Sequence, residues 1–477
     1  MAVTELVAPE ATPVAPVSPR STRLLKPGWP LSVLFLGFPV WWAMGLSQVI
    51  FLLVAVPMAL ELIRRSKISV PRGFGFWLLF LIWVVAGLLV LSAQAPGTVP
   101  GGGPARLFVY GYRFAWYLAI TVVMLYVYNL DERSLPTRRV LRLLAYMFVV
   151  TSVFGVLATL APHFEFRSLL ELLLKYGFHR QLHPTGFVYS LIHPQLASSS
   201  DFLGYTQPRP TAPFAYSNAW GNNFGLYLPF FVAAWLGRDA GWRRYVAPVV
   251  LIAAVPPVIY SLNRGLWIGL GLGAVYTAVR LAVNGRVRLL QVLIAAIVIG
   301  GAIFVSSPLY DTVVLRIETP HSNERRASVA GEVISATESS PVLGYGSTRQ
   351  KQGSYASLAG GETPTCHQCA PPPLGTQGFM WRLIFTTGFV GTGLCLTFLF
   401  MQFLLHSRGA AVLDVIGCMV ILESLLFFLV YDSLESPLFT LMLAIGLMAR
   451  GRRLAAPPPL AAGSAPGTLL AAGADRA

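Results

Sequence analysis

Arg264 stands between two apolar stretches, residues 245–261 and 265–283, which are each long enough to cross a bilayer. A cation at a membrane boundary costs free energy when it moves inward, so it is retained either for function or as a snorkelling anchor. The five N–H donors of an arginine match the oxygens of a phosphate group. Arg264 is therefore a candidate for binding an anionic headgroup.

Three further charged residues are expected in the same outer half of the membrane: Arg113, Arg382 and Glu423. Four charges gathered in one leaflet suit an anionic headgroup better than a channel through the membrane. The structural alternative is a set of ion pairs, such as Arg382 with Glu423. From the residues alone, both interpretations stay open.

The composition indicates that these residues belong to a membrane protein. The chain has 477 residues, of which 55% are hydrophobic and only 12% are charged, and its mean hydropathy is +0.63. Soluble domains are about one quarter charged. We therefore predict an all-α polytopic membrane protein with about twelve transmembrane helices, near residues 30–44, 46–63, 74–92, 107–129, 140–161, 216–236, 245–261, 265–283, 288–306, 380–405, 410–431 and 434–449.

The arginines and lysines predict that both termini are cytoplasmic. With this orientation every inner segment carries a cation, as in the group Arg133, Arg138, Arg139 and Arg142. The net charge of +15 is then a topology signal, and no nucleic-acid partner is expected. We predict disordered cytoplasmic tails at 1–28 and 453–477 around a transmembrane domain at 29–452.

Two predicted outer loops, about 162–215 and 307–379, are too long to be simple connections. In the first, the amphipathic stretch 167–178 is expected to lie on the membrane surface. The second, between the ninth and tenth spans, opens with a predicted helix at about 322–337. It also holds Cys366-His367-Gln368-Cys369, which favours a local disulfide over a zinc site because two further ligands are missing. No metal is expected.

Four short motifs occur in a fixed order along the chain. Ser261-Leu262-Asn263-Arg264-Gly265 resembles a signature of the O-antigen ligase and polymerase superfamily, and Arg209 to Asn218 resembles its upstream R-x-x-x-x-F-x-x-x-N element. Arg326 precedes Pro341 to Gly346 by fifteen residues, similar to the family's loop arginine and P-x-x-G-x-G. Residues 388–391 match the G-x-x-G that follows.

The resemblance implies a GT-C-like, metal-independent glycosyltransferase of the bacterial cytoplasmic (inner) membrane that needs no cofactor. Its donor would be a polyprenyl-pyrophosphate-linked saccharide, and its acceptor a glycan or lipid-linked glycan. The pyrophosphate would lie near Arg264 and Arg326, which would stabilise the leaving group electrostatically. Together with the membrane-facing charges, the expected substrate-binding residues are Arg264, Arg326, Arg209, Asn218, Arg113 and Arg382.

One position departs from the family pattern. Gln377 stands where a histidine is usual, and a glutamine can orient a hydroxyl group but cannot accept its proton. His367, Glu338 and Glu362 are possible substitutes for the base. The alternative functions are a transporter or flippase for lipid-linked glycans and a non-catalytic membrane scaffold.

Overall fold

The computed structural model describes residues 26–101, 103–178, 187–200, 203, 205–237, 239–318, 321–352 and 372–455, without the side chains of 187 and 321–325. The structure is mostly helical, at 71%. Within the described part of the chain, seven helices are long and apolar enough to cross a membrane. The all-α character of the prediction is therefore confirmed, and the apolar helices suggest a membrane protein. The twelve crossings and the cytoplasmic termini remain predictions.

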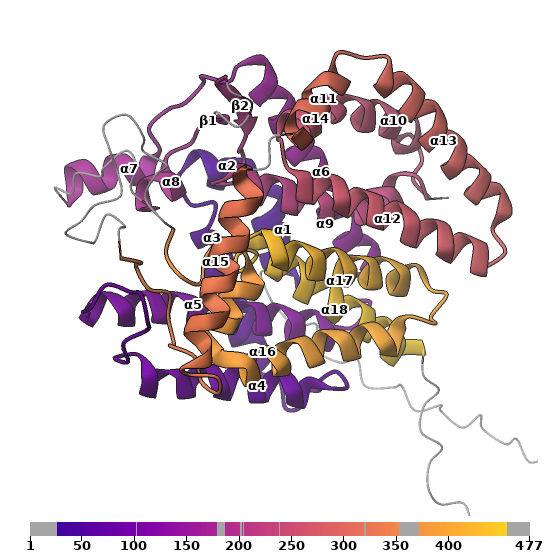
Figure 1. The fold of residues 1–477 in the computed structure, drawn as a ribbon. Helices are drawn as coiled ribbons and strands as arrows, with labels where there is room; N and C mark the ends of the chain where they lie inside the picture. Colours follow the sequence, from indigo (N-terminus) through magenta and orange to yellow (C-terminus); the bar gives the residue numbers. More distant parts are fainter. Residues whose placement is uncertain are drawn as a thin grey trace, which may run out of the picture.

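The described helices follow the predicted apolar stretches closely (Figure 1). In chain order they are α1 (Trp29–Leu36), α2 (Phe38–Ala43), α3 (Val49–Ile63), α4 (Phe74–Ala86), η1 (Gly87–Val90), α5 (Gly103–Asn129), α6 (Thr137–Leu160), α7 (Leu169–Leu172), η2 (Leu173–Gly177), α8 (Phe187–Ile192), α9 (Ser217–Trp235), α10 (Arg243–Ala253), α11 (Val255–Tyr260), α12 (Arg264–Val283), α13 (Val287–Val305), α14 (Leu309–Glu318), α15 (His321–Glu338), α16 (Phe379–His406), α17 (Val412–Val430) and α18 (Ser436–Ala455).

Two predicted spans are each divided into two helices. The first breaks at Gly37 between α1 and α2, and the seventh breaks at Ala254 between α10 and α11. Pro256 and Pro257 follow the second break, and a proline in a helix removes a backbone hydrogen bond and crowds the preceding turn. This proline-containing helix, α11, ends directly before Ser261.

The bundle packs around α18. This helix is buried on all sides from Ser436 to Arg450 and lies against α5, α9 and α17. Elsewhere α6 packs against α9, and α4 packs against α16. By contrast α13 has no buried residue, and it contacts α12 and α14. The outer surface of the bundle is correspondingly apolar, as a lipid-facing surface requires.

The long connection between α6 and α9 is only partly helical. It contains a two-stranded antiparallel sheet, β1 (Ala197–Ser200) and β2 (Gln207–Pro210), in which Ser198 pairs with Arg209. Before the sheet, α7 and η2 expose Leu169, Leu173 and Tyr176. These exposed apolar side chains agree with the predicted surface-lying stretch at 167–178.

In the second long connection, α15 confirms the helix predicted at about 322–337. Figure 1 shows this helix crossing the neighbouring bundle helices, and it packs against α16. The segment after α15 then inserts beside a break in α16. The Tyr345 and Gly346 amides donate to the Phe385 and Thr386 carbonyls, and the Phe389 amide donates to the Pro341 carbonyl.

This insertion joins two of the sequence motifs. Gly388 has φ 67° within α16, and a Cβ there would lie 2.4 Å from the Val342 oxygen. A Cβ on Gly344 would likewise lie 2.6 Å from the Gly388 nitrogen. Both positions therefore need glycine, because an added side chain would collide with backbone. The P-x-x-G-x-G and G-x-x-G segments form one interlocked unit.

Candidate functional site

Arg209 on β2 holds the turn between α11 and α12. Its Nε donates to the Ser261 carbonyl at 2.6 Å and its Nη2 donates to Asn263 Oδ1 at 2.7 Å. A longer contact of 3.5 Å joins Nη2 to Asn218 Oδ1 at the start of α9. The structure thus brings the two motif segments together. Arg209 is only 9% exposed, so one part of its role is to order the turn that presents Arg264.

The turn itself is strained. Among the described residues, Leu262 with φ 54° and Gln377 with φ 69° are the two non-glycine residues with positive φ. Such conformations cost of order 1–3 kcal/mol and persist where the surroundings hold them, commonly at functional sites. The Asn263 side chain supplies part of that restraint, because its Nδ2 donates to the Ser217 carbonyl at 2.7 Å. Both strained residues lie in segments that sequence analysis associated with chemistry.

Arg316, which sequence analysis did not select, lies in the same place. It is 4% exposed, and its Nε donates to the Leu262 carbonyl at 3.3 Å. Burial, together with the nearby charges of Arg264 and Arg326, lowers its pKa to about 10. Burial lowers the pKa of Arg209 to about 10 as well, with contributions from Arg316 and Arg326. All of these guanidinium groups stay protonated at neutral pH.

We call Arg209, Arg264, Arg316 and Arg326 the arginine cluster. Its members come from β2, α12, α14 and α15, so four distant parts of the chain converge there. The N-terminal ends of α9 and α12 also lie at the cluster, through Asn218 and Arg264. Helix N-termini carry partial positive charge and amides that can bind an anion. The arrangement is suited to a ligand with several negative charges, such as pyrophosphate.

A second group of charges surrounds Arg113 and Arg382. Arg113 Nη2 donates to Thr348 Oγ1 at 2.8 Å, while Arg382 forms an ion pair with Asp432. The two arginines are close enough for their charges to interact. Beside them, the Tyr112 hydroxyl donates to Glu435 Oε1 at 2.8 Å. Of the four charges predicted to gather, Arg113 and Arg382 lie near each other, whereas Arg264 lies in the arginine cluster. Neither Asp432 nor Glu435 was predicted.

The α17–α18 turn connects the two groups. At one end, the hydroxyl of Tyr431 accepts a hydrogen bond of 2.8 Å from the Leu266 amide, in the first turn of α12. The next residue, Asp432, pairs with Arg382. Ser433 and Ser436 accept hydrogen bonds from Asn222 and Asn223 of α9, each within 3.0 Å. Tyr431 therefore lies beside the arginine cluster, and Asp432 belongs to the second group.

The ion pair suggested between Arg382 and Glu423 is wrong, because Arg382 pairs with Asp432 instead. Glu423 is fully buried in α17, and neither of its carboxylate oxygens has a hydrogen-bond partner within the described structure. Its Oε1 would lie 2.7 Å from a Cβ on Gly273 of α12. The carboxyl group therefore faces the middle of α12 and not the N-terminal end of α16, where Arg382 lies.

The residues predicted to be catalytic have different outcomes. Gln377 is half-buried two residues before Phe379, whose amide donates to the Tyr431 carbonyl at 2.8 Å, so it lies at the α17–α18 turn. Glu338 is exposed at the far end of α15, about 18 Å along the helix from Arg326. His367 lies outside the described residues, as do Glu362 and the two cysteines beside His367. The structure thus places Gln377 beside the α17–α18 turn, and Glu338 at the end of α15 away from Arg326.

The residues that sequence analysis missed had weak signals. Arg316 is one cation in an ordinary amphipathic helix, and nothing near it in the sequence resembles a motif. Asp432 and Glu435 offered a better signal, since they are two acids in a five-residue turn between two apolar helices. Acids at the ends of membrane spans are costly and frequently functional.

Comparison with known proteins adds no independent assignment. No protein-family model matches the chain. A search of curated proteins finds no match either. The resemblance to the O-antigen ligase and polymerase superfamily therefore depends on the motifs and their order.

Proposed function

We propose that this protein is a glycosyltransferase of the bacterial cytoplasmic (inner) membrane that uses a polyprenyl-pyrophosphate-linked saccharide as donor. It would transfer or polymerise the glycan on the outer face during assembly of a cell-envelope polysaccharide. The observation that carries the proposal is the convergence of Arg209, Arg264, Arg316 and Arg326 at two helix N-termini. A pyrophosphate next to an apolar chain is the ligand that this chemistry suits best in a membrane protein.

In the proposed reaction, the acceptor hydroxyl attacks the anomeric carbon of the donor sugar with inversion. The new bond joins the acceptor oxygen to that carbon, and the bond from the carbon to the pyrophosphate oxygen breaks. Its electron pair stays on the pyrophosphate, whose charge Arg264, Arg316 and Arg326 stabilise. Removing one such donor typically lowers the rate about 100- to 1,000-fold.

The acceptor hydroxyl must also lose its proton. Gln377 cannot accept it, and Glu338 is too far along α15. Among the described acids, Asp432 is our candidate for the base, because it directly follows Tyr431 at the arginine cluster and has a half-exposed side chain, at 45%. Its ion pair with Arg382 would hold the carboxylate in a fixed orientation.

Deletion of the gene, followed by mass spectrometry of carrier-linked saccharides, tests the proposal. We expect a polyprenyl-pyrophosphate-linked saccharide to accumulate, and the native gene to clear it. Arg264→Ala and Arg316→Ala should fail to clear it at normal protein levels, whereas the exposed Arg133→Ala serves as the matched control and should clear it. Clearance by both cluster variants would contradict the proposal.

The location of the saccharide in the deletion strain distinguishes a transferase from a flippase. If the deleted protein is a transferase, the saccharide accumulates on the outer face, where a glycosidase added to spheroplasts can digest it. If the deleted protein is a flippase, the saccharide accumulates on the inner face and is protected from digestion. A non-catalytic protein is the alternative that Gln377 suggests. After purification, such a protein would bind the carrier-linked saccharide but would not transfer it.

A further inference from the structure

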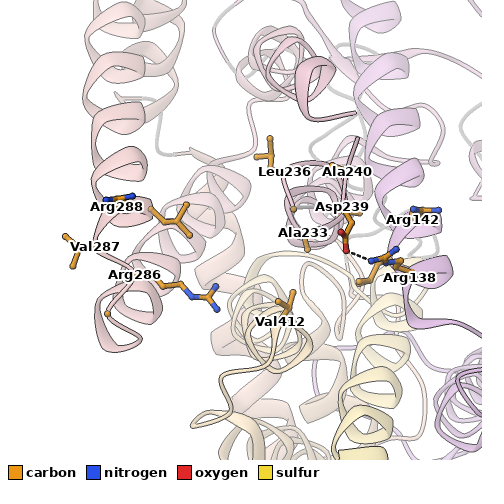
Figure 2. Close-up of a pocket in the computed structure, with 15 residues that line it drawn as sticks. Arg138, Arg142, Ala233, Leu236, Asp239, Ala240, Arg286, Val287, Arg288 and Val412 are labelled. Atoms are coloured by element: carbon orange, nitrogen blue, oxygen red, sulfur yellow. Dashed lines mark hydrogen bonds and ion pairs between the residues drawn. The ribbon is translucent and has the colours of Figure 1, made fainter. Parts of the chain in front are cut away.

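A cavity of about 1080 Å³ lies at the opposite end of the bundle from the arginine cluster. It opens to the surface and is bordered by the start of α6, the end of α9, the turn between α12 and α13, and the first residue of α17 (Figure 2). α12 runs from Arg264 at the cluster to Val283 beside this turn, a length of about 30 Å. The cavity is therefore separated from the proposed active site by the thickness of a membrane.

Four arginines line the cavity: Arg138, Arg142, Arg286 and Arg288. Asp239 is the one acid in the described wall, and it forms an ion pair with Arg138. Figure 2 shows Arg286 extending from the α12–α13 turn into the space in front of α9 and α6. The lining thus keeps a net positive charge of about three, which favours an anionic ligand.

The remaining lining is apolar. Leu141, Ala233, Leu236 and Val412 form the bundle side of the cavity, and Val287 and Leu289 begin α13. Every residue of α13 is outside the buried core, and its exposed side chains continue along the helix as Val292, Ile294, Ile297 and Val298. A basic mouth is therefore continuous with an apolar helix of membrane-spanning length.

We propose that this cavity binds an anionic phospholipid, with the phosphate at Arg286 and Arg288 and the acyl chains along α13. A soluble anion would use the arginines but would leave the apolar wall and α13 without a partner. Basic pockets between transmembrane helices on the cytoplasmic side bind the headgroups of anionic lipids. The proposal does not depend on the glycosyltransferase assignment.

Lipid titration of the full-length protein in detergent, followed by native mass spectrometry, tests the site. Phosphatidylglycerol should bind more tightly than phosphatidylcholine, which has the same chains and phosphate but no net charge. The Arg286→Ala/Arg288→Ala variant should bind phosphatidylglycerol roughly 10- to 30-fold more weakly. A control that removes two exposed arginines elsewhere, Arg64→Ala/Arg72→Ala, should bind like the native protein.

Two controls distinguish loss of lipid binding from misfolding, and lipid binding from binding of phosphate alone. Arg286→Lys/Arg288→Lys retains the charge and should keep most of the affinity, which a folding defect at these positions would not allow. Inorganic phosphate at millimolar concentration should not displace the lipid. Equal binding of the two lipids, equal binding by the alanine and control variants, or displacement by phosphate would each overturn the proposal.

Discussion

At the scale of single residues, the motifs contain two kinds of arginine. Arg209 is buried and donates to the Ser261 carbonyl and Asn263, so it supports the turn as well as contributing charge. Arg264 is half-buried at the start of α12, where a ligand can reach it. A lysine has no fork of fixed donors, so it cannot replace Arg209 at two partners at once.

The same scale holds the test of the proposed base. Asp432→Asn should reduce glycan transfer about 100- to 10,000-fold while carrier binding is retained, because proton removal is lost. Adding Gln377→His places an imidazole with an ordinary pKa near 6.5 beside the α17–α18 turn and should restore part of the transfer. In vitro transfer with a lipid-linked donor, measured from pH 5 to 9, checks both effects.

Asp311→Asn, at an exposed acid of α14, is the matched control and should leave transfer unchanged. Native transfer by Asp432→Asn would show that Asp432 is not the base. If the native protein shows no transfer and the Gln377→His variant does, the native protein binds the carrier without catalysis.

At the scale of elements, the break in α16 joins the large loop to the bundle. The Gly388 conformation allows α16 to accept the segment at 341–346, which follows directly on α15 and its Arg326. Trp83 of α4 donates to the Val342 carbonyl at 3.0 Å and secures the same segment. The position of Arg326 in the arginine cluster therefore depends on this junction.

We expect Gly388→Ala to destabilise the protein by about 1–3 kcal/mol, because its φ of 67° is strained for alanine and the added Cβ meets the Val342 oxygen. Gly393→Ala in the same helix is the control, since nothing lies within 4 Å of its Cβ. That change should be neutral or slightly stabilising. Thermal unfolding in detergent measures both, and equal unfolding temperatures for the two variants would argue against the junction.

At the scale of the whole molecule, the two basic regions lie at opposite ends of α12. The arginine cluster surrounds its first residue, and the cavity at the α12–α13 turn follows its last. If α12 crosses the membrane, the two regions contact different leaflets. The orientation of the protein therefore decides which region meets an exported glycan.

Cysteine labelling tests that orientation. In a background with Cys366 and Cys369 changed to serine, Gly103→Cys and Tyr205→Cys should react with a membrane-impermeant thiol reagent in intact cells. Arg133→Cys should react only after the cells are opened. All three positions are exposed, and the native Cys395 and Cys418 are buried, so the background signal should be low. Labelling of position 133 in intact cells would reverse the topology.

The amino-acid sequence by itself determined the helical membrane class and the two long connections. Apolar runs of 15 to 26 residues and the cations between them are local properties, and the twelve predicted stretches are each helical in the structure. The motif arginines Arg209, Arg264 and Arg326 could also be selected, because each belongs to a short segment with fixed spacing.

Only the tertiary structure decided which of these residues meet. Arg382 pairs with Asp432 and not with Glu423, and Arg316 joins the arginine cluster from a helix without a motif. Such contacts depend on how each helix is rotated about its axis. A helix such as α18, which is buried on all sides, has no polar face in its sequence to indicate that rotation. The partners of the charged residues are therefore fixed by packing, and composition and spacing could not predict them.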